Sequence, residues 1–310
     1  MYYVDVLETK NYLVQNPLSD NHPLYDANKT YNKGDIVNHN DYIYMCLADD
    51  TLGKTPGESV EWIFWNYVLN IASIYKYPAN TIACFDYYTQ TQSILGENKK
   101  FIFENNLFDY IGAYNVDNAN SVIVTIRDKD SGEAVFSQEL SMQEIMYYDW
   151  YLWSIDKQPK YKHNFSLKLP IIPNSFVELE FIGESISIGF IGLGQTNYLG
   201  CTLQNITKRI KSAKQFKRDE NSGTMYLDNR RVGGYSEISA NIFIKNYLEV
   251  DSTLNTLNKI KNQPVVFIVD DREDASIRKN NYTIFGLFED IENTLTNVSD
   301  SYTITIKSID

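Results

Sequence analysis

The sequence is poor in histidine and cysteine, the side chains that hold zinc and form disulfides. Its 310 residues include three histidines and three cysteines, and the cysteines Cys46, Cys84 and Cys201 lie far apart. There is no CxxC pair and no histidine near a cysteine at metal-ligand spacing, so the pattern indicates neither a zinc site nor a disulfide framework. We expect three reduced thiols in the protein core, with no metal and no cofactor.

Positive charge is also scarce. The chain has 28 Lys and Arg against 40 Asp and Glu, which gives a formal net charge of -12. Nucleic-acid binding needs clusters of Lys and Arg, so we expect no nucleic-acid partner. One basic stretch departs from this balance and contains Lys208, Arg209, Lys211, Lys214, Lys217 and Arg218. Such a run is most often a solvated helix face or a contact to an acidic neighbouring subunit.

Long apolar runs are missing as well. No stretch approaches the roughly 20 apolar residues of a membrane helix. The first residues, Met1–Val6, lack the basic segment and apolar run of a signal peptide. We therefore expect a chain that is made and folded in a cytoplasm, without membrane insertion.

Motifs for catalysis are absent too. No serine lies in a GxSxG elbow, and Gly192-Leu193-Gly194 leads to Gln195–Tyr198 with no helix signal, unlike a dinucleotide fingerprint. The acidic run Asp270–Asp274 lacks the glycine and the regular oxygen ligands of a calcium loop, so a solvated loop is favoured. No pair of carboxylates is singled out for glycoside hydrolysis. The sequence predicts a protein that is not an enzyme.

Aromatic residues are abundant. The chain has 24 Tyr, 15 Phe and 4 Trp, mixed with Ile, Val and Thr in short alternating runs, which half-buried strands favour. We expect a mainly β fold in four parts. These are an N-terminal arm (1–24) that docks onto something else, a small aromatic three-stranded module (25–70), a jelly-roll-like β-sandwich (79–195) and a C-terminal β domain with one helix (196–310).

Short alternating segments define the two larger parts. For the sandwich we expect strands at Thr81–Tyr88, Lys100–Glu104, Ser121–Arg127, Ala134–Leu140, Asn164–Leu169, Ser175–Ile182 and Ile186–Ile191. The residues from Arg127 to Gly132 form a hairpin turn in which glycine supplies a positive φ. For the C-terminal domain we expect strands at Gly233–Leu248, Val265–Val269, Tyr282–Phe288 and Tyr302–Ile306. A helix capped by Asp251-Ser252 should present Leu254, Leu257 and Ile260 on one face.

The aromatic module has an ordered pattern of its own. Tyr31 precedes Gly34-Asp35-Ile36-Val37, an Asn-Asp turn leads to Tyr42-Ile43-Tyr44, and a Pro-Gly loop at Pro56-Gly57 leads to Trp62. Two short strands joined by a turn, followed by a loop and a Trp, can build a tiny three-stranded unit whose rings substitute for a large core.

This order resembles the chitin-binding type of small carbohydrate-binding modules. The resemblance covers Tyr25–Val68, and Tyr31, Gly34, Asp35, Val37, Tyr44, Pro56 and Trp62 occupy the family positions. It departs at Asp41, where the family usually has glycine and where Asp can adopt a left-handed turn. The resemblance implies carbohydrate binding by Tyr31, Tyr42, Tyr44, Trp62 and Trp65. In the alternative interpretation some of these rings form the core, and the module is a spacer that packs on neighbouring subunits.

The C-terminal part resembles tailed-bacteriophage tail and neck proteins. The resemblance rests on Pro264–Ile268, Tyr282–Asp290 and Tyr302–Ile306, and on the preceding run Ile191–Thr202. It implies a structural virion component in which a hairpin and one helix build a ring-forming domain. We therefore expect a ring or hub made by self-assembly and by contacts with other virion proteins, located in the virion, with a host surface glycan as a further partner for host attachment.

The alternative belongs to another class of protein. It is a free carbohydrate-binding protein, or the accessory module of a glycan-degrading system. The missing secretion signal counts against it. Polysaccharide binding by a monomer would favour this alternative, and rings in electron microscopy would favour the virion component.

Overall fold

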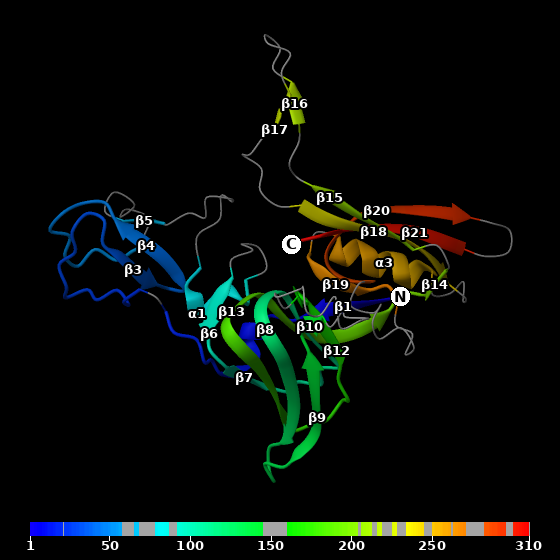
Figure 1. The fold of residues 1–310 in the computed structure, drawn as a ribbon, viewed down its shortest axis with the longest axis horizontal. Helices are drawn as coiled ribbons and strands as arrows, with labels where there is room; N and C mark the ends of the chain where they lie inside the picture. Colours follow the sequence, from blue (N-terminus) through cyan, green and yellow to red (C-terminus); the bar gives the residue numbers. More distant parts are fainter. Residues whose placement is uncertain are drawn as a thin grey trace, which may run out of the picture.

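The protein is mainly β, as the composition predicted (Figure 1). The computed structural model describes residues 1–20, 22–57, 65–67, 78–86, 92–144, 160–203, 206–212, 216–218, 225–227, 234–244, 250–261, 263–270, 282–295 and 300–309. One large antiparallel sheet runs in the order β12-β8-β13-β1-β19-β20-β21-β18-β14, with β2, β6, β7, β9 and β15 attached beside this path. Three small sheets are separate from it.

Two long bent strands organise the predicted sandwich, β8 (Tyr110–Asp128) and β13 (Ser175–Tyr198). Their outer halves pair with each other and with the neighbours β9 (Ala134–Ser141) and β7 (Lys99–Glu104). Their other halves pair with each other and with β12 (Phe165–Lys168) and β1 (Tyr2–Val6). Each strand therefore belongs to both layers of the sandwich.

The bend lies where the sequence pattern predicted a break between two strands of β13. The β13–β8 register shifts around Gly183, and Ser185 and Asn118 have positive φ values of 54° and 60°. A Cβ atom at Gly183 would lie 2.4 Å from the carbonyl oxygen of Asn118, so the close approach of the two strands requires glycine there. The predicted strands Ser175–Ile182 and Ile186–Ile191 are thus two halves of one strand.

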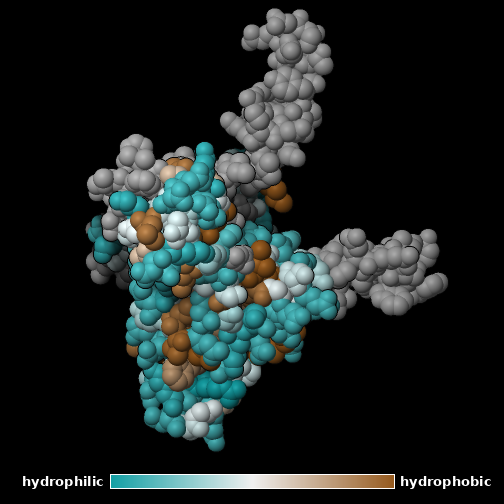
Figure 2. All heavy atoms as spheres, turned by 90° about the vertical axis from the view of Figure 1, so that its left-hand side faces the viewer, coloured by the Kyte–Doolittle hydropathy of each residue, from teal (hydrophilic) through white to brown (hydrophobic). Residues whose placement is uncertain are grey.

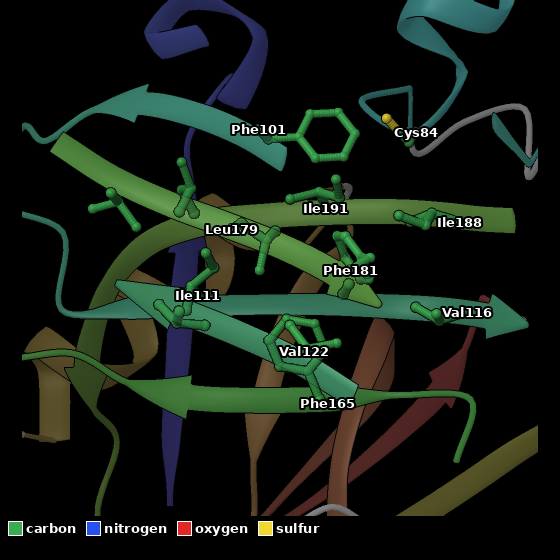
Figure 3. Close-up of a cluster of buried hydrophobic side chains, with 14 of the residues drawn as sticks. Cys84, Phe101, Ile111, Val116, Val122, Phe165, Leu179, Phe181, Ile188 and Ile191 are labelled. Atoms are coloured by element: carbon green, nitrogen blue, oxygen red, sulfur yellow. The ribbon is translucent and has the colours of Figure 1, made fainter. Parts of the chain in front are cut away.

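The core of the sandwich lies between these two layers (Figure 3). Leu179 and Phe181 of β13 point inward beside Phe101 of β7 and Val122 of β8. From the other half of β13, Ile188 and Ile191 reach the same cluster, together with Phe165 of β12. Alternate burial along Ser175–Phe181 matches its period-2 sequence pattern, because one face packs inward and the other meets solvent.

The N-terminal segment is a central strand of the large sheet. β1 pairs with β13 on one side and with β19 (Val265–Ile268) on the other, so that Tyr3 stands opposite both Asn197 and Phe267. The prediction of a separate arm over 1–24 is therefore wrong for these residues. The predicted boundary at 195/196 also falls inside β13, which runs to Tyr198. In addition, β1 joins the sandwich to the C-terminal strands without a break in pairing.

The C-terminal strands follow the predicted order. After β18 (Gly234–Ile244) come α3 (Val250–Ile260), β19, β20 (Thr283–Leu295) and β21 (Asp300–Ser308). Even-numbered residues of β18, such as Ile238 and Ile242, are buried against Leu257 and Ile260 of α3. The helix therefore covers one face of the sheet, as its apolar stripe predicted.

The remaining elements are short. They are η1 (Thr9–Tyr12), β2 (Leu13–Gln15), β3 (Ile36–His39), β4 (Tyr42–Cys46), β5 (Trp65–Tyr67), α1 (Asn80–Ala83), β6 (Ser93–Gly96), β10 (Gln143–Glu144), β11 (Lys160–Tyr161), β14 (Cys201–Thr202), β15 (Thr207–Ser212), β16 (Phe216–Arg218) and β17 (Met225–Leu227). The β16–β17 pair reaches away from the rest of the protein (Figure 1).

Two predicted elements differ in the structure. The start of the strand expected at Thr81–Tyr88 is the helix α1, whose Thr81 N–H donates to the carboxylate of Asp20, 61 residues earlier. The basic stretch was expected to be a solvated helix face or a contact to an acidic neighbouring subunit. It begins with the strand β15, which pairs with β18, so the helix interpretation is wrong there. In both cases the element contacts a partner distant in sequence, and such tertiary contacts can override local propensity.

The cysteines divide into two groups. Cys46 and Cys84 are buried free thiols, whereas Cys201 is exposed. The expectation that all three lie in the core is therefore wrong for Cys201. Cys201 begins β14 at the end of the sheet path, where no later strand covers it among the described residues.

Candidate binding module and assembly surfaces

The aromatic module forms the three-stranded sheet that its sequence predicted. β3 and β4 make a hairpin in which His39 pairs with Tyr42, and β5 pairs with β4. The turn residues Asn40 and Asp41 have φ values of 47° and 70°. Two successive left-handed residues give the tight turn that matches strand twist, and Asn and Asp tolerate this conformation.

Three of the five predicted sugar-binding residues form the core of the module. Tyr31, Tyr44 and Trp65 are 2%, 4% and 2% exposed. The Tyr31 and Trp65 rings lie 5.2 Å apart at 72°, and Trp65 Nε1 donates to the carbonyl oxygen of Lys54 at 2.7 Å. A sugar ring can stack only on an accessible aromatic face, so these three side chains serve the core, as the alternative interpretation allowed.

The other two predicted residues differ in position. Tyr42 is half-buried at the edge of the same cluster, and its backbone forms an isolated β-bridge with Pro78. Trp62 lies outside the described residues. In the described part of the module Met45 and Leu52 are exposed large hydrophobic residues, and Leu24, just before the module, is exposed as well. Figure 2, which faces this side of the protein, shows hydrophobic groups interrupted by hydrophilic side chains.

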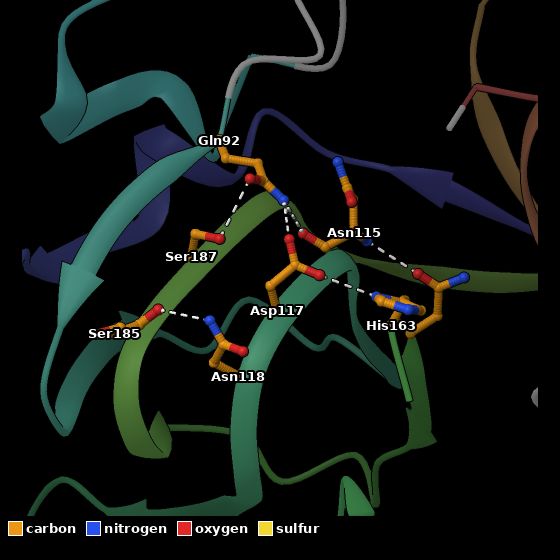
Figure 4. Close-up of polar contacts among 8 residues, drawn as sticks. Gln92, Asn115, Asp117, Asn118, His163, Ser185 and Ser187 are labelled. Carbon is orange, nitrogen blue, oxygen red and sulfur yellow. Dashed lines mark hydrogen bonds and ion pairs between the residues drawn. The ribbon is translucent and has the colours of Figure 1, made fainter. Parts of the chain in front are cut away.

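A polar cluster holds the bend of β8 and β13 (Figure 4). Asp117 accepts a hydrogen bond from Gln92 Nε2 at 2.9 Å and pairs with His163 Nδ1 at 3.0 Å. Ser187 Oγ donates to Gln92 Oε1 at 3.2 Å, and Asn115 N donates to Asn164 Oδ1 at 2.9 Å. These contacts tie β13 and the approach to β12 onto β8, so the cluster acts as a structural clamp at the bend.

Charged residues gather on the outer face of the C-terminal sheet. Glu237 of β18 is only 6% exposed because Lys211 and Arg209 of β15 and Lys307 of β21 surround it. The hydrogen bond from Lys211 lowers the pKa of Glu237, and the attraction of the other cations acts in the same direction, while burial opposes it. The same bond raises the pKa of Lys211. This cluster fastens β15 to the sheet.

The edge strands of the large sheet include β9 and β15. β9 pairs with β8 and β15 pairs with β18, and neither has a second neighbouring strand among the described residues. Most side chains of both strands are exposed, including Val135 at 57% and Ile210 at 84%. Figure 1 shows β9 at the bottom of the view and β15 in its upper part, below the β16–β17 pair. Exposed strand edges can pair with another chain.

Other kinds of site receive no support from the described part of the chain. No group of three or more His, Cys, Asp or Glu side chains within it is arranged to hold a metal ion. No helix in the described ranges is long and apolar enough to cross a membrane. The acidic run begins with Asp270, which is buried, and its other members lie outside the described residues. No protein-family model and no curated protein matches the sequence, and no solved structure matches the fold.

Proposed function

We propose that the protein is a structural component of a bacteriophage virion tail or neck. It builds a ring or hub by associating with copies of itself and with other virion proteins. The observation that carries this proposal is the presence of two exposed edge strands, β9 and β15, attached near opposite ends of the path of one sheet. An edge presents backbone N–H and C=O groups that a neighbouring subunit can pair, and two separate edges allow each subunit two neighbours.

The electrostatics agree with association between subunits. The chain carries a net charge of -12, yet β15 contains Lys208, Arg209 and Lys211. Opposite charges on separate surfaces steer partners together and fix their relative orientation. A cationic strand on an acidic protein therefore favours contact with an acidic surface, and another copy of the chain supplies such surfaces.

Size-exclusion chromatography with light scattering, followed by electron microscopy of the purified protein, tests the assembly. We expect a defined oligomer that appears as rings or short stacks. Immunogold labelling of virions of the encoding phage tests the location, with label expected at the tail or neck. A protein that stays monomeric at all concentrations tested, or virions without label, contradicts the proposal.

Glycan adhesion is an added role in this proposal and depends on the surface of the module. The rings of Tyr31, Tyr44 and Trp65 are buried. Of the predicted sugar-binding residues that the structure describes, Tyr42 alone is half-buried. A pull-down with insoluble chitin compares the wild type with Tyr42→Ala, and Tyr12→Ala, which alters a partly buried ring of the sandwich, is the control. Adhesion is supported if the wild type and Tyr12→Ala are retained on chitin and Tyr42→Ala is not. Retention of a monomeric wild type favours the free carbohydrate-binding alternative.

A further inference from the structure

The two exposed edges differ in chemistry, and the hydrogen-bond pattern shows which of their backbone groups face outward. Met142 directly follows β9 and continues its register with β8, opposite Asn120. Its N–H donates to the carbonyl oxygen of Asn120 at 2.9 Å. Hydrogen-bonded and non-hydrogen-bonded pairs alternate along an antiparallel ladder. Leu140 and Gln138 therefore share hydrogen-bonded pairs with β8, and the N–H and C=O groups of Ser137 and Glu139 point away from the sheet.

In β15, too, the hydrogen bonds to the neighbouring strand show which backbone groups face outward. Leu203 N–H donates to the carbonyl oxygen of Asn241 at 2.8 Å, so odd-numbered residues of β18 turn their backbone groups toward β14 and β15. β18 keeps an unbroken register with β21, and this alternation therefore continues to Glu237, opposite Arg209. The backbone groups of Arg209 thus face β18, and those of Ile210 face outward.

Ile210 lies on the apolar face of the C-terminal sheet, the face that α3 covers, but Ile210 itself is exposed. Its position opposite Ser236, next to the Lys208–Ile238 pair, places it on the face where Ile238 is fully buried. Ile210 itself is 84% exposed because β15 is the outermost strand. A strand added beside β15 would bring side chains next to Ile210 and remove part of its surface from water.

The charges of the two edges are complementary. β15 carries three cationic residues, Lys208, Arg209 and Lys211, and keeps a net positive charge although Arg209 and Lys211 share the carboxylate of Glu237. β9 carries Glu139, with Glu133 just before it. Both of these glutamates are exposed. Pairing two β15 edges would place cations opposite cations, and like charges on directly opposite residues of neighbouring strands destabilise a sheet. The charge pattern therefore favours contact between unlike edges.

We propose that β15 of one copy pairs with β9 of the next, so that the sheet continues from subunit to subunit. This inference rests on the proposed function and specifies the surfaces that perform it. The contact joins two different surfaces, so repetition gives a closed ring when the rotation between subunits closes, and a filament when it does not. The eight residues of β9 and the six of β15 provide ladders of similar length.

Proline variants test the pairing because proline removes one N–H donor. Glu139→Pro and Ile210→Pro each delete an outward-facing N–H that takes no part in the ladder within the chain, and edge strands tolerate proline at such positions. Glu139→Thr and Ile210→Thr are the matched controls, since they alter the side chain and keep the N–H. We expect both proline variants to be monomeric by light scattering and both threonine variants to assemble.

A mixture of the two proline variants tests directly whether β15 of one copy pairs with β9 of another. Glu139→Pro keeps an intact β15, and Ile210→Pro keeps an intact β9, so an equimolar mixture should form a one-to-one dimer that cannot grow. Native mass spectrometry of chains with different tags detects it. If both proline variants assemble like the wild type, the inference is wrong while the proposed function stands. If the wild type is monomeric, both are wrong.

A second pair of variants covers the case in which proline disturbs folding. Glu139→Lys places a cation on the β9 edge, opposite the cations of β15, and should weaken self-association on the order of tenfold at low salt, with recovery as salt rises. Glu139→Gln is the control. Circular dichroism spectra and melting temperatures equal to those of the wild type establish that the fold is kept. Self-association of Glu139→Lys equal to the wild type at low salt would also overturn the inference.

Discussion

Phe190 of β13 and Phe285 of β20 stack with their ring centroids 4.5 Å apart and their planes at 16°. Tyr114 of β8 stacks on Phe285 at 5.4 Å, and its hydroxyl shares a hydrogen bond with that of Tyr110. These rings pack with Val4 and Val266 of β1 and β19 into a separate buried cluster. The sandwich and the C-terminal strands are therefore joined by side-chain packing as well as by β1.

Phe285→Ala should destabilise the whole protein, because the aromatic cluster links its two larger parts. Removing a buried phenylalanine ring costs roughly 3–5 kcal/mol of unfolding free energy. Urea denaturation followed by tyrosine fluorescence and by circular dichroism measures this loss. Leu287→Ala, which alters a 36% exposed residue of the same strand, is the control, with a change within about 0.5 kcal/mol. Equal losses for the two variants would contradict this role of the cluster.

The thiols should differ sharply in reactivity. Burial raises the pKa of Cys84 to about 12, so its reactive thiolate is nearly absent at pH 8, whereas Cys201 is exposed. A disulfide reagent should therefore label one thiol per chain in the folded protein and all three in denaturant. Cys201→Ser should abolish labelling of the folded protein. Rapid labelling of Cys84 or Cys46 in that variant would show that the buried thiols are accessible.

Local chemistry made part of the fold predictable from the sequence. The Asn40-Asp41 turn, the turn ending at Gly132 and the stripe of Leu257 and Ile260 each depend on residues close together in the chain, and the structure contains all three features. The pattern of alternation also gave the strand positions on either side of the bend at Gly183.

Long-range pairing explains what the sequence did not reveal. The place of β1 depends on Asn197 and Phe267, and the start of α1 depends on Asp20. The rings of the module pose a related problem, because an aromatic residue of a small module can stack on a sugar or fill the core with the same sequence pattern. For Tyr31 and Trp65, the surrounding residues determine that the rings are buried.

Trp65→Ala should unfold the aromatic module, because Trp65 fills the core between Tyr31 and Tyr25. Loss of a buried tryptophan costs about 3–5 kcal/mol, which exceeds what the small core of this module can lose and stay folded. Two-dimensional NMR should show loss of the dispersed signals of the hairpin β3–β4. Tyr42→Ala, at the edge of the cluster, should keep them. A folded module in the Trp65→Ala variant would contradict the assignment of this ring to the core.

Glu237→Gln should lower stability in a manner that depends on pH. The hydrogen bond from Lys211 lowers the pKa of Glu237 in the folded state, so the carboxylate contributes stability above its unfolded pKa of about 4.3 and loses it as the pH falls through the lower folded value. The difference in melting temperature between wild type and Glu237→Gln should thus be largest near pH 7 and shrink below pH of about 4. Glu289→Gln is the control for an exposed partner, because Glu289 binds Lys307 at a 48% exposed site and its pair contributes little in water. A difference between wild type and Glu237→Gln that stays constant from neutral to acidic pH would show that the ionised carboxylate does not stabilise the β15 edge.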